Sequence, residues 1–158
     1  MKLLLSGATL LLFFGLFGCS NDDSGGSVFC DSQALAPETI VGATLDATID
    51  ASSSAAFCQD ENGSYDGTFS ADTYDLAYTG SEECDSTSGN YTYSAEGSIG
   101  TVDADQTAPE TAVAKLELCV TEIEVFSGTT TYKGNYRLTA EGDTGSQTGT
   151  FDLVPGEV

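Results

Sequence analysis

The sequence predicts an all-β domain, an antiparallel meander of about seven to eight strands that closes into a barrel or, alternatively, forms a β-sandwich. From Glu38 onward, apolar residues recur at every second position, which is the period of a strand. Short clusters of Gly, Asn, Ser and Asp separate these runs, as expected for strands joined by tight turns. The composition agrees, because the 158 residues include 18 Gly, 40% hydrophobic residues and only 18% charged residues. This length and composition suit one folded domain.

Residues 1–18 have the features of a bacterial signal peptide. Lys2 precedes an apolar run over residues 3–17, which is shorter than the roughly 18 residues expected of a membrane-spanning helix. The run ends at Leu16-Phe17-Gly18-Cys19, which resembles the lipobox of bacterial lipoproteins. That resemblance implies that Cys19 carries acyl chains such as palmitate and becomes the mature N-terminus. An ordinary secretory signal that leaves Cys19 unmodified is the alternative.

Residues 19–36 are expected to form a flexible tether, and residues 37–158 the single β-domain. The polar stretch from Ser20 to Ser27 is rich in Gly and Ser and has no apolar surface to bury. Ser20 after the Cys resembles lipoproteins sorted to the outer membrane. We therefore expect a cell-envelope protein held at the outer membrane by its N-terminal lipid, with the periplasmic or surface face left open.

The charge balance excludes several classes of partner. The chain has 4 Lys and Arg against 25 Asp and Glu, and its formal net charge is −21. Such a surface is repelled by nucleic acids and anionic headgroups, so we expect no nucleic-acid partner and membrane attachment through the lipid alone. We interpret the excess charge as a source of solubility in a monomer, with a cation-binding role as the alternative.

The strand signals follow one another along the chain. Apolar residues recur at every second position of Ala112–Val120, but Ile123 and Val125 fall on the opposite set of positions, which predicts a bulge or bend near Thr121. A Gly followed two residues later by an aromatic also recurs, and it favours a meander that closes into a barrel. Further alternating runs cover 65–69, 74–78, 132–138 and 151–153, and turns are expected at 61–63, 87–90, 127–128 and 142–145.

A second resemblance covers residues 38–140. Bacterial lipocalin-like lipoprotein domains have an opening strand, similar here to Ile40–Leu45, and then a Cys that leads into an acidic turn, similar to Cys58–Asn62. The strand Tyr65–Phe69, the turn Ala71–Tyr74, Cys84 and the strand Ser88–Tyr91 match the rest of that pattern. The resemblance implies a barrel that can hold a small apolar ligand.

Four cysteines remain after Cys19, an even number that suits an oxidising compartment. Cys30, Cys58, Cys84 and Cys119 allow three pairings, and their spacing does not choose among them. The lipocalin-like resemblance implies Cys58–Cys84, which leaves Cys30–Cys119. Zinc binding is the disfavoured alternative, because there is no Cys-x-x-Cys.

Two sets of candidate site residues stand out. Asp60, Asn62 and Asp66 offer oxygen ligands for a hard cation such as Ca²⁺, although their order is not that of an EF-hand. The second set comprises tyrosines in expected strands, which either fill a barrel or line a pocket for a ligand. These candidate ligand-binding residues are Tyr74, Tyr78, Tyr91, Tyr93 and Tyr136.

Three function classes follow from these features. The sequence favours a lipid-anchored, lipocalin-like module that binds a small apolar molecule without catalysis or a cofactor. The alternative is a structural or surface-interaction lipoprotein with a filled core and no ligand. An enzyme is disfavoured, because the chain has no His and no Gly-x-Ser-x-Gly motif.

Overall fold

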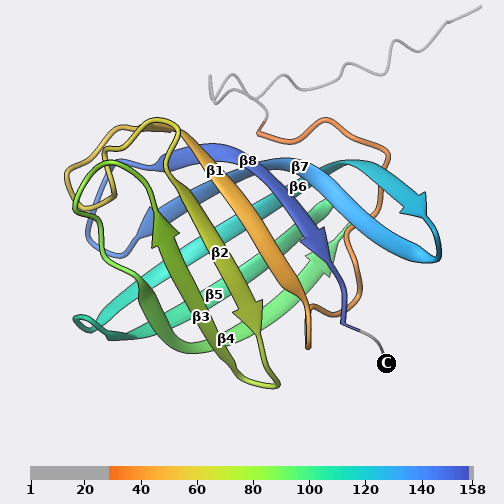
Figure 1. Ribbon diagram of the computed structural model, residues 1–158, viewed down its shortest axis with the longest axis horizontal. Helices are drawn as coiled ribbons and strands as arrows, with labels where there is room; N and C mark the ends of the chain where they lie inside the picture. The colour runs from red at the N-terminus through yellow and green to blue at the C-terminus, as the bar shows by residue number, and fades with distance from the viewer. Residues whose placement is uncertain (1–28, 157–158) are drawn as a thin grey trace, which may run out of the picture.

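Eight strands form one closed antiparallel barrel in which every strand pairs with its neighbours in the chain (Figure 1). The computed structural model describes residues 29–156, so the predicted signal peptide 1–18 and the predicted lipidation site Cys19 lie outside the described residues. All regular secondary structure in the described part is β. The strands are β1 (Thr44–Ser52), β2 (Ser64–Phe69), β3 (Thr73–Thr79), β4 (Thr87–Glu96), β5 (Ile99–Ala108), β6 (Ala112–Phe126), β7 (Thr129–Ala140) and β8 (Gln147–Val154).

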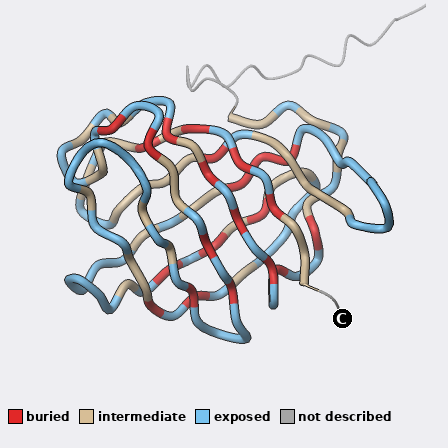
Figure 2. The backbone as a smooth tube through the Cα atoms, viewed as in Figure 1, coloured by how far each residue is buried: buried red, intermediate tan, exposed pale blue. Residues whose placement is uncertain are grey.

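Pairing of the first and last strands closes the sheet. Leu45 of β1 lies opposite Leu153 of β8, and Ala47 lies opposite Phe151. All four side chains are buried, whereas Asp46 between them is exposed. A similar alternation of buried and less buried residues runs along β4, β5 and β8 (Figure 2). This two-residue period is the one seen in the sequence, and closure excludes the β-sandwich alternative.

The predicted irregularity near Thr121 is confirmed. The register between β6 and β7 shifts between Val120 and Glu122, so Thr121 is the extra residue of a bulge. Beyond it the two strands continue as a hairpin that projects past the barrel (Figure 1). Three apolar residues near its tip are exposed: Ile123 (42%), Val125 (69%) and Phe126 (76%).

Three sequence-based expectations on element positions were wrong. Residues 87–90 begin strand β4 rather than form a turn, and the first strand begins at Thr44 rather than Ile40. Strand β5 was not expected at all. Its inward positions are Gly100, Val102, Ala104 and Gln106. Only Val102 among them is a large apolar residue, so the apolar period is weak and the order of the strand depends on pairing with β4 and β6.

Both disulfides implied by the lipocalin-like resemblance are present. Cys58 bonds to Cys84, which joins the β1–β2 loop to the β3–β4 loop, and Cys30 bonds to Cys119 on β6. The second disulfide holds the N-terminal segment 29–36 against the barrel wall, although the sequence places this segment in the tether. The Ala36 amide also donates to the Gly97 carbonyl at 2.9 Å.

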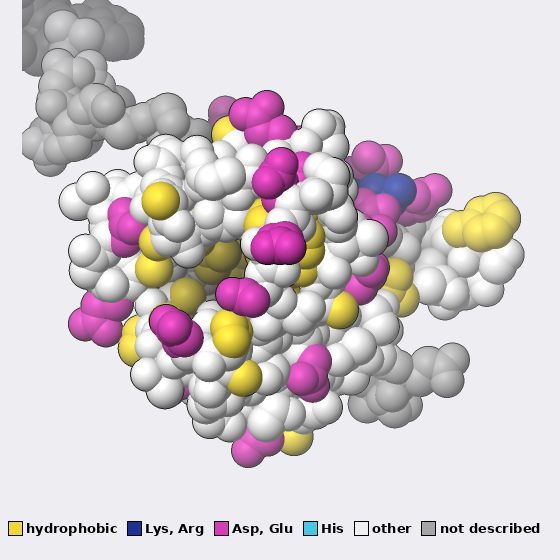
Figure 3. All heavy atoms as spheres, turned by 60° about the vertical axis from the view of Figure 1, so that its left-hand side comes forward, with side chains coloured by type: hydrophobic (Ala, Val, Ile, Leu, Met, Phe, Trp, Pro, Cys, Tyr) yellow, Lys and Arg dark blue, Asp and Glu magenta, His cyan; other side chains and the backbone are white. Residues whose placement is uncertain are grey.

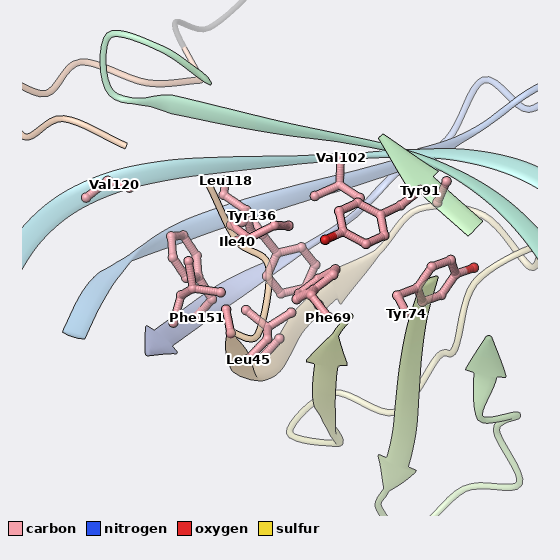
Figure 4. Packing of buried hydrophobic residues seen from close by; sticks show 14 residues of the cluster. Ile40, Leu45, Phe69, Tyr74, Tyr91, Val102, Leu118, Val120, Tyr136 and Phe151 are labelled. Carbon is pink, nitrogen blue, oxygen red and sulfur yellow. The ribbon is translucent and has the colours of Figure 1, made fainter. Parts of the chain in front are cut away.

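One end of the barrel is closed by the segment before β1. Ile40 is 1% exposed and packs with the core residues of the barrel, among them Leu118 and Phe151 (Figure 4). The Tyr93 hydroxyl donates to the Pro37 carbonyl at 2.7 Å and fixes this segment in place. Burial raises the pKa of Tyr93 to about 12. Within residues 29–156 no helix has the length and hydropathy needed to cross a membrane.

Candidate functional site

A cavity of about 710 Å³ occupies the other end of the barrel. The inner faces of the strands form its walls, and the β1–β2 and β3–β4 loops with the β5–β6 turn form its mouth. Figure 3 shows a hollow with apolar side chains inside and acidic side chains around it. Phe57 and the Cys58–Cys84 disulfide lie at this mouth, so the disulfide joins two of the loops that border the opening.

Small side chains make room for the cavity. Ala104 of β5 lies opposite Ala114 of β6, which in turn lies opposite Ala140 of β7. All three line the cavity, as does Ala112. A methyl group fills much less of a barrel interior than the side chain of Leu or Phe does. The alanine side chains therefore leave space between this wall and the large rings of the opposite wall. An eight-stranded barrel is just wide enough for side chains to fill it, and the alanine row leaves part of it unfilled.

Aromatic rings form the facing wall. Tyr65 and Phe69 of β2 and Tyr74 of β3 line the cavity there, and Tyr136 of β7 lines it beside the alanine row. Burial raises the pKa of Tyr74 and of Tyr136 above the ordinary tyrosine value. The hydroxyls are therefore neutral at physiological pH and can serve as polar contacts within an otherwise apolar space.

The five candidate ligand-binding tyrosines do not act as one set. Tyr74 and Tyr136 line the cavity. Tyr91 is buried beyond it, with its hydroxyl donating to the Ser70 carbonyl at 2.7 Å, and Tyr93 contacts the segment that closes the far end. Tyr78 donates to the Asp60 carboxylate beside the loops. Alternation placed these rings correctly on strand faces, but it carries no information on depth along the barrel.

Sequence reasoning missed several lining residues. Tyr65 was expected in a strand but was not singled out, and the alanines carry no signal that separates a cavity wall from ordinary packing. Gln147 was also missed. Gln147 is only 1% exposed, and its side-chain Nε2 donates to the Ser52 hydroxyl at 3.1 Å and to the Cys58 carbonyl at 3.0 Å. The Tyr136 hydroxyl donates to the Gln147 Oε1 at 3.3 Å, which leaves a small polar group in the cavity wall.

The three candidate cation ligands, Asp60, Asn62 and Asp66, have different surroundings. The Asp60 carboxylate accepts hydrogen bonds from the Tyr78 hydroxyl and from the Ser81 amide, the latter at 2.7 Å. The Tyr78 hydrogen bond is the main cause of the lowered pKa of Asp60. Asn62 and Asp66 are both exposed, Asp66 on the outer face of β2. Among the described residues, no group of three or more Cys, Asp or Glu is arranged to hold a metal ion.

The mouth of the cavity is acidic. Four exposed acidic residues line it, and we call them the rim acids: Glu82, Glu83, Asp85 and Glu110. The three cationic residues of the described chain lie away from the cavity lining. Lys133 pairs with Glu124 at 2.8 Å and Arg137 pairs with Glu117 at 2.6 Å, while Lys115 lies on the exposed face of β6.

Comparison with known proteins found no match: no protein-family model, curated protein or solved structure matches this chain. Its function is therefore inferred from the cavity.

Proposed function

We propose that this protein is a lipid-anchored lipoprotein of the cell envelope whose barrel binds a small apolar molecule without chemical change. The cavity of about 710 Å³ carries the proposal. It falls within the range of about 300–1,000 Å³ typical of small-molecule sites. Its lining also has the usual composition of such sites, mainly aliphatic and aromatic side chains with a few polar groups such as Tyr136 and Gln147.

The cavity favours ligand binding over the filled-core alternative. A barrel that serves only as a scaffold gains stability by filling its interior, because each buried CH₂ contributes about 0.8 kcal/mol. The row of Ala104, Ala114 and Ala140 forgoes that stabilisation across three adjacent strands. A ligand that enters from the mouth would contact this row on one side and the rings of Tyr65 and Phe69 on the other.

The groups available at the cavity support binding rather than catalysis. Inside, the polar groups are hydroxyls and amides, which orient a ligand by hydrogen bonding. The rim acids are exposed to solvent. Paired carboxylates act as acid and base when a shielded cleft holds one of them away from water, and the exposed rim acids are not shielded in this way.

The anchor is the second part of the proposal. The lipobox-like end at Cys19 supports it, and ten residues from Cys19 to residue 28 precede the described chain. Such a segment spans at most about 35 Å when extended, which lets the barrel stand clear of a bilayer. The mass of the protein extracted from bacterial membranes tests this part: an acylated N-terminal Cys19 supports it, and an unmodified chain that keeps Cys19 contradicts it.

Native mass spectrometry tests ligand binding. The oxidised barrel is incubated with an envelope lipid extract and then measured with and without unfolding. An adduct that is lost on unfolding is expected for the parent chain. The Ala104→Phe variant places a ring in the cavity and should lose the adduct, whereas Val113→Phe, on the outer face of β6, should keep it. A bare mass for the parent chain would favour the filled-core alternative.

A further inference from the structure

We propose that the cavity selects cationic amphiphiles, with an apolar body inside the barrel and one positively charged amine or quaternary ammonium group at the mouth. This inference rests on the proposed ligand-binding function and specifies its ligand class. It depends on two separate observations, the apolar cavity and the sign of the charge around its mouth.

The interior sets the apolar part of the ligand. Ala104, Ala114 and Leu116 face the space from one side, and Phe69 and Leu76 face it from the other. Nothing on these walls can neutralise a charge, so a charged group buried there would lose its hydration without compensation. The charge of an amphiphile must therefore stay at the mouth, where water and the rim acids surround it.

The mouth sets the sign of the charge. Four of the residues that line the cavity are acidic and exposed, and none is Lys or Arg. A cleft bordered by one sign of charge, with low-dielectric walls, concentrates the field and raises the local concentration of the opposite charge. The negative charge of the rim also acts on Tyr65 inside the cavity. Burial is the main cause of the raised pKa of Tyr65, and the negative charge of Asp85 is the second cause.

The aromatic wall suits the same ligand class. Tyr65 lies near the start of β2, at the mouth end of the barrel, and it contacts Tyr78 edge to face with ring centroids 5.4 Å apart. The faces of tyrosine rings attract ammonium and quaternary ammonium groups. A carboxylate headgroup would meet the rim acids and gain no such contact, so fatty acids are disfavoured.

Calorimetric titration of the oxidised protein with three amphiphiles of equal chain length tests the inference. Decyltrimethylammonium, decanol and decanoate differ in headgroup charge; the two ions are used below their micelle concentrations and decanol below its solubility limit. We expect the cation to bind about tenfold more tightly than the alcohol at low salt, and the anion to bind more weakly than either. High salt should reduce the difference, because exposed charges are screened.

Two charge-matched variants separate the rim from the overall acidity of the chain. One replaces the rim acids, and the other replaces four exposed acids on the outer wall. The substitutions are Glu82→Gln, Glu83→Gln, Asp85→Asn and Glu110→Gln in the first variant, and Asp46→Asn, Asp66→Asn, Asp75→Asn and Asp103→Asn in the second. The first should lose the preference for the cation over the alcohol, and the second should keep it.

The outcomes distinguish this inference from the proposed function. If decanol binds as tightly as decyltrimethylammonium, the cavity binds ligands but the charge selection is overturned. If both variants lose the preference equally, the overall charge and not the rim is responsible, and the inference again fails. If none of the three amphiphiles binds the parent chain, the proposed function fails together with the inference.

Discussion

Ala104 on β5 lies directly opposite Ala114 on β6, and both methyl groups line the cavity. The two strands are paired over eight residue positions, so the position of this pair is fixed by the sheet and not by a loop. Its neighbour across β7 is Ala140. Three adjacent strands thus place small inward side chains at one level of the barrel, beneath the mouth.

Filling this row should stabilise the barrel and weaken ligand binding. In Ala114→Leu, the added carbons enter an existing apolar space, so we expect the free energy of unfolding to rise by about 1–2 kcal/mol. Urea denaturation measures the change, and affinity for an apolar ligand should fall in the same variant. Val113→Leu on the exposed face of β6 is the control and should alter neither quantity. A marked loss of stability in Ala114→Leu would show that the space is not available for a side chain.

The two disulfides should make different contributions. Cys30–Cys119 spans 89 residues and Cys58–Cys84 spans 26, and the chain-entropy relation gives about 4.6 and about 3.5 kcal/mol for loops of these lengths. Removing the first pair with Cys30→Ala and Cys119→Ala should therefore cost about 1 kcal/mol more in unfolding free energy.

Ligand binding should show the reverse order. Cys58 and Cys84 line the mouth of the cavity, so the variant Cys58→Ala with Cys84→Ala frees two loops that border the ligand. We expect it to lose more affinity than the Cys30–Cys119 variant does. Equal losses of affinity in the two variants would argue against a role for the loops in binding.

The Asp60 cluster should make stability depend on pH. The hydrogen bond from Tyr78 and those from the backbone lower the pKa of Asp60 in the folded protein below its value in the unfolded chain. The unfolded chain then takes up the proton first as the pH falls. The stability that the carboxylate contributes is present above the ordinary aspartate pKa of 3.8 and is lost as the pH falls through the lowered value.

Comparison with Asp60→Asn isolates this contribution. We expect the variant to have a lower Tm than the parent protein at neutral pH, and the difference to narrow below about pH 4. Asp66→Asn removes an exposed carboxylate from the outer wall and should not lower the Tm. A difference between Asp60→Asn and the parent that stays constant with pH would contradict the assignment of Asp60 as an ionised hydrogen-bond acceptor.

Gly149 on β8 should not tolerate a side chain. A Cβ at this position would overlap the Thr48 carbonyl of β1 and approach the Tyr136 ring at 2.7 Å. The carbonyl belongs to the pairing that closes the barrel, so it cannot move away without disturbing that pairing. Gly149→Ala should therefore destabilise the protein by about 2–4 kcal/mol in chemical denaturation.

Gly67→Ala on β2 provides the comparison. Its nearest neighbour is the Leu76 Cδ2 at 2.6 Å, the end of a flexible side chain that borders the cavity and has room to turn. We expect a smaller loss of stability there. Equal losses at the two positions would mean that the seam between β1 and β8 is not especially sensitive to crowding.

Much of the local structure could be predicted from the sequence. Alternation located the strands around Tyr65, Tyr74 and Phe151, and the change of parity at Ile123 predicted the bulge at Thr121. The disulfide pairs were implied by the lipocalin-like resemblance and are present. The strands and the bulge are local features, so neighbouring residues are enough to reveal them, whereas the disulfide pairs depended on the resemblance. Strand β5 was missed because Gly100 and Ala104 provide little apolar contrast with the residues between them.

The sequence by itself determined which residues share a strand face, but the tertiary structure decided what each face meets. Whether Tyr136 fills the interior or borders a cavity depends on Ala104 and Ala114, which come from other strands, together with Ala140 of its own strand. Their alignment depends on the register of three strands, and closure depends on the pairing of β1 with β8, almost the whole domain apart in sequence. A period of two residues fixes the direction of a side chain and leaves its depth along the barrel undefined. The volume of the cavity is therefore a property of all eight strands together.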